Sequence, residues 1–251
     1  MAVAISEAGD VGEVGVVSLN WVEKRNSLGP DDAAELAAAI EDAGKRYRAV
    51  VLTGEGAFCS GGDLRTFARI TAGASVEDIQ QVVYGKIHSV VRALRDCPVP
   101  TVAAVDGAAV GLGMDLALAC DVRFVGPAGW IQQGWSRAGL IAAGAGSYFL
   151  SRIDDQLPWT LMINQERLDA AACERLRIAV AAPEGARVAA VEAAKVLAAL
   201  PDLAQAGYVA LNRGPRWPSD EYLDSCASTQ AQLLTSAEFQ ARVSEILGTP
   251  K

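Results

Sequence analysis

The sequence is short of residues on which several large classes of protein depend. His88 is its one histidine in 251 residues, so a site with several histidine ligands is excluded, and a Ser-His-Asp triad could use no other histidine. The five cysteines are scattered and never form a C-x-x-C pair. This pattern indicates reduced intracellular thiols, and neither a disulfide framework nor a zinc site. No metal site is predicted.

Long apolar runs and long basic runs are absent as well. No apolar segment reaches the roughly 18–20 residues of a membrane helix, and the first residues, MAVAISEAGD, lack the basic-then-apolar pattern of a secretion signal. The formal net charge is -8, which disfavours nucleic acid and anionic membranes as partners. We therefore expect a cytoplasmic protein with no nucleic acid partner and no membrane insertion.

The chain is rich in residues that build a core. Hydrophobic residues make up 51% of it, and its length suits one large domain or one domain with a small extension. Valine-rich segments at 15–20, 49–54, 101–107 and 121–126 predict strands. Their near-continuous apolar character indicates strands that are buried on both faces of a sheet.

Helical patterns lie between the strands and dominate the second half of the chain. Pro30 and the two acids after it suit a helix start, and Leu36 and Ile40 repeat at helical spacing. Beyond residue 150 we expect helices without strands, and a turn at 214–218 that interrupts them. The helical segments expected there are 154–180, 185–200 and most of 219–247.

Two glycine turns each follow a predicted strand and open onto a helix. They are FCSGGDL (58–64) and GLGMDL (111–116). Adjacent glycines let a ligand approach the backbone, and a helix start leaves N–H groups unpaired. Either turn, taken singly, could be only a tight turn. Together they can present two N–H donors to one oxygen, as an oxyanion hole requires.

Segments around these turns resemble the enoyl-CoA hydratase/isomerase family, the crotonases. The resemblance implies an α/β fold, with a ββα spiral core over 1–190 that binds acyl-CoA and a helical trimerisation region over 191–251. It further implies a homotrimer or hexamer in fatty acid metabolism, with a coenzyme A thioester as substrate and no other cofactor. The segments are LNWVEKRNSL (19–28), AVVLTGEGAFCSGGDL (49–64), PVPTVAAVDGAAVGLGMDLALACDVRFVG (98–126) and GLIAAGAGSYFLSRI (139–153).

The resemblance also implies roles for individual residues. The backbone N–H groups of Gly62 and Leu112 would bind the oxygen of a thioester enolate. Coenzyme A would lie along Arg25 and along the first glycine turn. The open alternative is that Arg25 and Lys24 are two ordinary solvated charges that bind no ligand. The coenzyme-binding residues of that turn would be Ser60, Gly61, Asp63 and Leu64.

One acid, Asp115, stands inside the apolar run that follows the second turn. It lies three residues after Leu112, on the same face of the expected helix. Burial would raise its pKa, which suits proton transfer near neutral pH. The alternative is that it braces a backbone turn by hydrogen bonds. Family hydratases carry a second glutamate about twenty residues later, and the alignment places Trp135 at that position.

With these residues, the resemblance implies an acyl-CoA-binding crotonase with Asp115 as its one catalytic acid. It would act on an enoyl-CoA or related thioester through a stabilised enolate, by isomerisation, decarboxylation or slow hydration. The alternative is an acyl-CoA carrier or regulatory protein without turnover. We expect His88 to be a partly exposed helix residue, and Cys59 to be a small packing residue with no role as a nucleophile.

Overall fold

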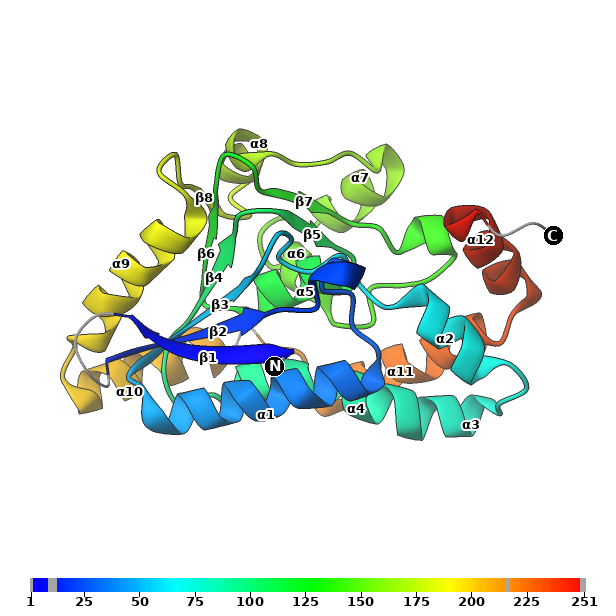
Figure 1. Cartoon of the computed structure of the whole chain (residues 1–251), viewed down its shortest axis with the longest axis horizontal. Coiled ribbons are helices and arrows are strands. Elements are labelled where there is room, and N and C mark those ends of the chain that lie inside the picture. The colour runs from blue at the N-terminus through cyan, green and yellow to red at the C-terminus, as the bar shows by residue number, and fades with distance from the viewer. Residues whose placement is uncertain (1, 9–12, 215–216, 249–251) are drawn as a thin grey trace.

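The computed structural model describes residues 2–8, 13–214 and 217–248 and contains a six-stranded sheet at its centre (Figure 1). The strand order is β1-β2-β3-β4-β6-β8. The first pair is antiparallel and the other neighbouring pairs are parallel. The strands are β1 (Val3–Ala8), β2 (Val14–Leu19), β3 (Ala49–Gly54), β4 (Thr101–Val105), β6 (Val122–Val125) and β8 (Val180–Ala181).

A second, smaller sheet lies beside the two glycine turns. It consists of β5 (Ala108–Val110) and β7 (Trp130–Gln132), which run parallel. An isolated bridge joins Cys59 to Ala109, so the first glycine turn is attached directly to this sheet.

Twelve α-helices are described, of which α1 and α9 pack directly on the large sheet. They are α1 (Pro30–Arg46), α2 (Leu64–Thr71), α3 (Val76–Asp78), α4 (Gly85–Asp96), α5 (Leu112–Ala119), α6 (Gly146–Ser151), α7 (Leu157–Asn164), α8 (Ala170–Arg175), α9 (Ala186–Ala198), α10 (Asp202–Arg213), α11 (Asp220–Leu234) and α12 (Ala237–Leu247). Short 3-10 turns are η1 (Val22–Lys24) and η3 (Ser136–Ala138), and η2 (Ile79–Tyr84) is a π-helix.

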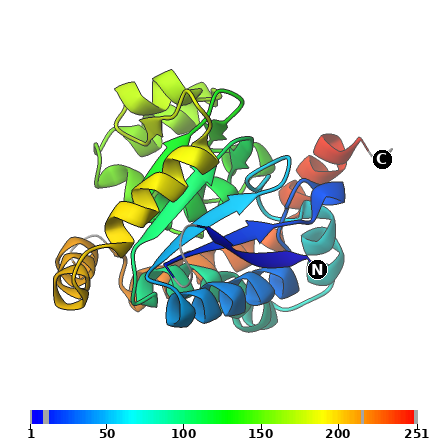
Figure 2. The ribbon, with the colours of Figure 1, turned by 60° about the vertical axis from the view of Figure 1, so that its left-hand side comes forward.

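Alternate residues of the strands point into two different cores. In β3, Val50 and Leu52 pack in the large core that contains α1 and α4, whereas Val51 packs in a second core with α9. The α9 helix contributes an alanine stripe to this second core, and Figure 2 shows it lying across the sheet. The prediction that the strands are buried on both faces is therefore confirmed for β2, β3 and β4, whereas three of the four residues of β6 are only half-buried.

The sequence-based prediction was wrong at three places beyond the central strands. β1 was not predicted, because only one of its six residues is fully buried and no clear alternation marks it. The expected helix over 154–180 is broken into α7 and α8 by the left-handed residue Gln165. The two-residue strand β8 follows, although no strand was expected beyond residue 150.

The C-terminal helices pack in different places. The α11 helix lies against η2 and α3, and α12 lies against η3 and α2. The α10 helix lies apart from the body of the molecule (Figure 2). The predicted turn at 214–218 includes residues 215 and 216, which lie outside the described residues. The predicted domain boundary at 190/191 falls within α9, and the division stays a prediction.

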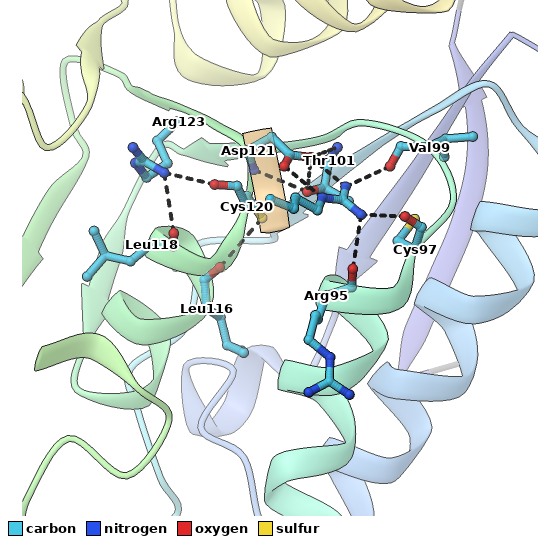
Figure 3. Close-up of polar contacts among 10 residues, drawn as sticks. Arg95, Cys97, Val99, Thr101, Leu116, Leu118, Cys120, Asp121 and Arg123 are labelled. Carbon is cyan, nitrogen blue, oxygen red and sulfur yellow. Dashed lines mark hydrogen bonds and ion pairs between the residues drawn. The ribbon is translucent and has the colours of Figure 1, made fainter. Parts of the chain in front are cut away.

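A buried arginine ties the end of α10 to the core. Arg213 Nε donates to Asp121 Oδ1 at 2.8 Å, and its Nη2 donates to the carbonyl of Val99 at 2.8 Å. Asp121 also accepts from the backbone N–H of Thr101 at 2.8 Å and from its hydroxyl at 3.0 Å. Figure 3 shows Thr101 and Asp121 together at this junction.

Among the described helices, none is both long enough and apolar enough to span a bilayer.

Candidate active site

The two predicted glycine turns meet backbone against backbone. The N–H of Cys59 donates to the carbonyl of Ala108 at 2.9 Å, and the N–H of Val110 donates to the carbonyl of Cys59 at 3.0 Å. A Cβ atom on Gly113 would lie 2.0 Å from the Cys59 carbonyl oxygen. Only glycine permits so close an approach, so the sequence of the second turn brings α5 against the first turn.

Two backbone N–H groups remain unpaired where the turns meet. Leu112 is the first residue of α5, and Gly62 directly precedes Asp63, the N-cap of α2. No described residue accepts a hydrogen bond from either amide. A Cβ atom on Gly61 would lie 3.9 Å from the amide nitrogen of Leu112, so the first turn borders that amide closely. Both amides are available to a ligand atom.

Two cavities lie on either side of this junction and share Ser60, Gly62 and Leu64 in their walls. The smaller one, of about 190 Å³, is further lined by residues that include Trp135 and Arg137. The larger one, of about 570 Å³, is lined by four of the five residues predicted to bind the coenzyme, whereas the fifth, Gly61, lines the smaller cavity. We call them the tryptophan cavity and the arginine cavity. The arginine cavity includes Arg25, Asp63 and Lys24.

Two of the three basic residues that line the arginine cavity, Lys24 and Arg25, differ in their contacts. Lys24 Nζ forms an ion pair with Asp32 at 2.6 Å, and it lies 5.4 Å from the centre of the Trp21 ring. Arg25 is exposed and forms no ion pair with any described residue. Its carbonyl accepts a hydrogen bond from Ser60 N–H at 3.1 Å, which joins η1 to the first glycine turn. Arg65, the third basic residue, is exposed and likewise forms no ion pair with a described residue, so a ligand in this cavity can reach both Arg25 and Arg65.

Asp63 has a structural task within the turn. Its Oδ1 accepts from the backbone N–H of Thr66 at 3.1 Å, and its Oδ2 accepts from the Thr66 hydroxyl at 3.0 Å. This N-cap fixes the start of α2. The side chain is thus occupied, and the backbone is paired as well: the Asp63 N–H donates to the Leu28 carbonyl at 2.9 Å, and the Asp63 carbonyl accepts from Phe67 N–H at 2.8 Å. Leu64 follows it as the first residue of α2 and lines both cavities.

Asp115 is fully buried behind the tryptophan cavity. Its Oδ2 accepts from the backbone N–H of Gly144 at 3.1 Å, and its Oδ1 lies 3.5 Å from the indole Nε1 of Trp135. Burial raises the pKa of Asp115 to about 7, although these hydrogen bonds act in the opposite direction. Trp135 lines the tryptophan cavity, whereas Asp115 lines neither cavity. The carboxyl group therefore braces the loop at 142–146, and its role in proton transfer stays a prediction.

The same loop is held from two other sides. His88 Nε2 lies 2.9 Å from the carbonyl of Ala143, and Gln230 Oε1 accepts from the N–H of Ile141 at 2.9 Å. The expectation that His88 is partly exposed was wrong, because η2 and α11 pack over this part of the molecule. Its burial lowers the pKa of His88, which favours a neutral imidazole that donates from Nε2.

Cys59 lies under the junction of the two turns. It is fully buried, and burial raises the pKa of its thiol to about 12. A protonated, inaccessible thiol is a poor nucleophile. The structure agrees with the expectation that Cys59 is a packing residue.

Comparisons with known proteins identify the family. The sequence profile of the family described as "Enoyl-CoA hydratase/isomerase" matches residues 10–212. The chain is 32% identical over 241 residues to the "Probable enoyl-CoA hydratase EchA14" of Mycobacterium tuberculosis, with 92% of each chain covered.

Solved structures bear out the predicted fold. An enoyl-CoA hydratase/isomerase from Mycobacterium paratuberculosis superposes with a TM-score of 0.85 at 24% identity, covering 97% of this chain and 98% of the other. An enoyl-CoA hydratase from Bacillus halodurans gives a TM-score of 0.85 at 20% identity, covering 98% and 100%. These similarities confirm the α/β crotonase fold, and the chain belongs to the enoyl-CoA hydratase/isomerase family.

Proposed function

We propose that this protein binds an acyl-CoA thioester whose carbonyl oxygen accepts hydrogen bonds from the amides of Gly62 and Leu112. The observation that carries the proposal is that these two amides are unpaired where the two glycine turns meet. An enolate oxygen carries more negative charge than a thioester carbonyl, so two fixed donors stabilise the enolate more strongly. One such donor is worth about 3–4 kcal/mol in related sites.

The coenzyme portion occupies the arginine cavity in this proposal. Arg25 is exposed there without an ion-pair partner among the described residues, and it can meet a phosphate of the coenzyme. The shared wall of Ser60, Gly62 and Leu64 then receives the thioester end of the coenzyme arm. The acyl group passes Gly62 and enters the tryptophan cavity.

The reaction that follows uses at most one carboxyl group of the protein. Asp115 is the family-matched acid, and its pKa of about 7 suits either release or uptake of a proton near neutral pH. Trp135 takes the place of the second acid, so a water molecule would lack the pair of carboxylates that activates it. We infer a one-acid reaction of the isomerase type, in which Trp135 has to shift before Asp115 reaches the substrate.

The second candidate function is acyl-CoA binding without turnover. The observation that favours it is the burial of Asp115 behind Trp135, outside both cavity walls. A protein that only binds acyl-CoA needs the same two amide contacts for affinity, but it needs no residue that transfers a proton.

Titration calorimetry with three ligands tests the binding proposal. Butanoyl-CoA is compared with S-butyl-CoA, a thioether that lacks the carbonyl, and with free butanoate. We expect butanoyl-CoA to bind at least ten-fold more tightly than the thioether, and butanoate not to bind measurably. Equal affinity for thioester and thioether would remove the oxyanion-hole assignment.

A substrate screen separates the two candidate functions. Wild-type protein is assayed with 2-enoyl-, 3-enoyl- and malonyl-type CoA thioesters, together with Trp135→Glu and the uncharged control Trp135→Gln. Turnover of a 3-enoyl-CoA by the wild type supports the enzyme. Hydration that appears in Trp135→Glu alone supports the assignment of Trp135 to the second acid position. Binding without turnover of any thioester supports the carrier.

A further inference from the structure

The wall of the tryptophan cavity carries a positive charge and no negative one. Of the described residues that line it, Arg137 is the one charged residue, and none is an acid. Arg137 is exposed within η3 and forms no ion pair with any described residue. An unpaired guanidinium on a cavity wall without carboxylates favours an anionic ligand group there.

A second guanidinium lies beside the first. Arg242 of α12 donates from Nη1 to the backbone carbonyl of Arg137 at 3.4 Å. A Cβ atom on Gly139 would lie 3.0 Å from Arg242 Cδ, so this side chain runs over the same turn. Arg242 likewise forms no ion pair with a described residue. Two neighbouring cations raise the positive potential at this end of the cavity.

The position of Arg137 relative to Gly62 indicates which part of a ligand it would meet. Gly62 lies in the wall of both cavities, whereas Arg25 lines only the arginine cavity and Arg137 lines only the tryptophan cavity. A thioester carbonyl bound at Gly62 therefore has Arg25 and Arg65 on one side and Arg137 on the other. The coenzyme phosphates can occupy one side, and the acyl group occupies the other.

We propose that the acyl group of the ligand ends in a carboxylate, and that Arg137 binds this carboxylate. The ligand is then the coenzyme A monothioester of a dicarboxylic acid. The proposal rests on the acyl-CoA binding proposed above. A planar guanidinium suits a carboxylate because it can donate two parallel hydrogen bonds, which an ammonium group cannot do in the same geometry. Gln132 also lines this cavity, but its Nε2 already donates to the Gln165 carbonyl at 2.6 Å.

A phosphate of the coenzyme could supply the same negative charge from the other end of the ligand. The two sources differ in what they predict. A phosphate is present in every acyl-CoA, so the loss of a contact between Arg137 and a phosphate would weaken the binding of all acyl-CoA ligands alike. A terminal carboxylate is present only in the dicarboxylic thioesters, so the loss of a contact between Arg137 and this carboxylate would weaken the binding of those ligands alone.

Titration calorimetry with matched thioester pairs tests the proposal. The probes are glutaryl-CoA against pentanoyl-CoA and succinyl-CoA against butanoyl-CoA, each pair having the same number of acyl carbons. The variants are Arg137→Gln, Arg137→Lys and Arg25→Gln. Arg175→Gln is the matched control, since Arg175 is exposed, lies in α8 and lines neither cavity.

We expect wild-type protein to bind at least one dicarboxylic thioester ten-fold or more tightly than its uncharged counterpart. Arg137→Gln should abolish this preference and leave affinity for the uncharged thioesters within two-fold, and Arg137→Lys should keep part of it. Arg175→Gln should change nothing, and Arg25→Gln should weaken all four ligands.

Two results would overturn the proposal while leaving acyl-CoA binding intact. One is a wild-type protein without preference for either dicarboxylic thioester. The other is equal weakening of charged and uncharged thioesters by Arg137→Gln, which would assign Arg137 to a coenzyme phosphate. If the wild type binds none of the four thioesters, the proposed function fails as well.

Discussion

The indole nitrogen of Trp135 lies 3.5 Å from a carboxylate oxygen of Asp115, although twenty residues separate the two in the sequence. The contact places an aromatic ring between the tryptophan cavity and the acid. Proton transfer by Asp115 therefore requires movement of this ring.

Asp115→Asn provides the test of the acid. The amide keeps the size of the side chain and can still accept from Gly144 N–H, but it cannot carry a proton to a substrate. If the protein is an enzyme, we expect turnover to fall by at least about a hundred-fold, with acyl-CoA affinity within a few-fold of the wild type. Single-turnover assays and calorimetry on the same preparation measure both. Brisk turnover by Asp115→Asn would show that another group moves the proton.

Stability should depend on pH through the same residue. An aspartate has a pKa near 3.8 when unperturbed and about 7 in the folded protein, so between these values the folded state holds a proton that the unfolded chain has lost. The resulting stabilisation is complete below about pH 4 and is lost as the pH rises to about 7, by up to about 4 kcal/mol for a fully buried carboxyl.

Urea unfolding of wild type and Asp115→Asn at pH 5, 6, 7 and 8 measures this effect. The difference in free energy of unfolding, wild type minus variant, should decrease from pH 5 to pH 7 and level off above pH 8. A difference that is constant over the whole range would contradict a raised pKa at Asp115.

Removal of the buried guanidinium of Arg213 should destabilise the fold. Arg213→Met leaves the partly buried Asp121 carboxylate without its cation and frees the carbonyl of Val99. We expect a loss of about 3–5 kcal/mol, as for other buried pairs that lose one partner. Arg92→Met is the control, since Arg92 pairs with Asp220 at the surface and should cost less than about 1 kcal/mol. Equal losses in both variants would contradict a special role for Arg213.

The exposed apolar face of α10 predicts self-association. Leu203 and Leu211 are 87% and 77% exposed, and Tyr208 is also exposed. Such a face is typical of a subunit interface. We expect sedimentation equilibrium to show a trimer or hexamer, and Leu203→Glu/Leu211→Glu to shift it toward the monomer. Val82→Glu, at an exposed residue of η2, is the control. A wild-type monomer at micromolar concentration would contradict the prediction.

Features set by local sequence were predictable. Continuous valine-rich segments identified β2 and β3, since their residues are apolar on both faces. The two glycine turns were also predictable, because adjacent glycines have few other uses between a strand and a helix. A two-residue strand such as β8 has no such pattern, and its pairing with β6 depends on the chain between them.

The surroundings of Asp115 were not predictable in the same way. Its partner Gly144 lies 29 residues away, and the loop that carries Gly144 is positioned by His88 and Gln230 from two further helices. Only the assembled packing of these helices decides whether the carboxyl group faces a cavity or a loop. The apolar residues around Asp115 indicated burial, which the structure confirms, but they carried no information on its partners.

Two consecutive residues at the end of α12 contribute to the walls of the two cavities. Ile246 lines the tryptophan cavity, and Leu247 lines the arginine cavity. Gly248 then ends the helix in a left-handed conformation. The last turn of a helix is its least stable part, so we expect its unwinding to widen both cavities at once. A ligand that spans both cavities should then leave at a rate set by the opening of this single helical turn.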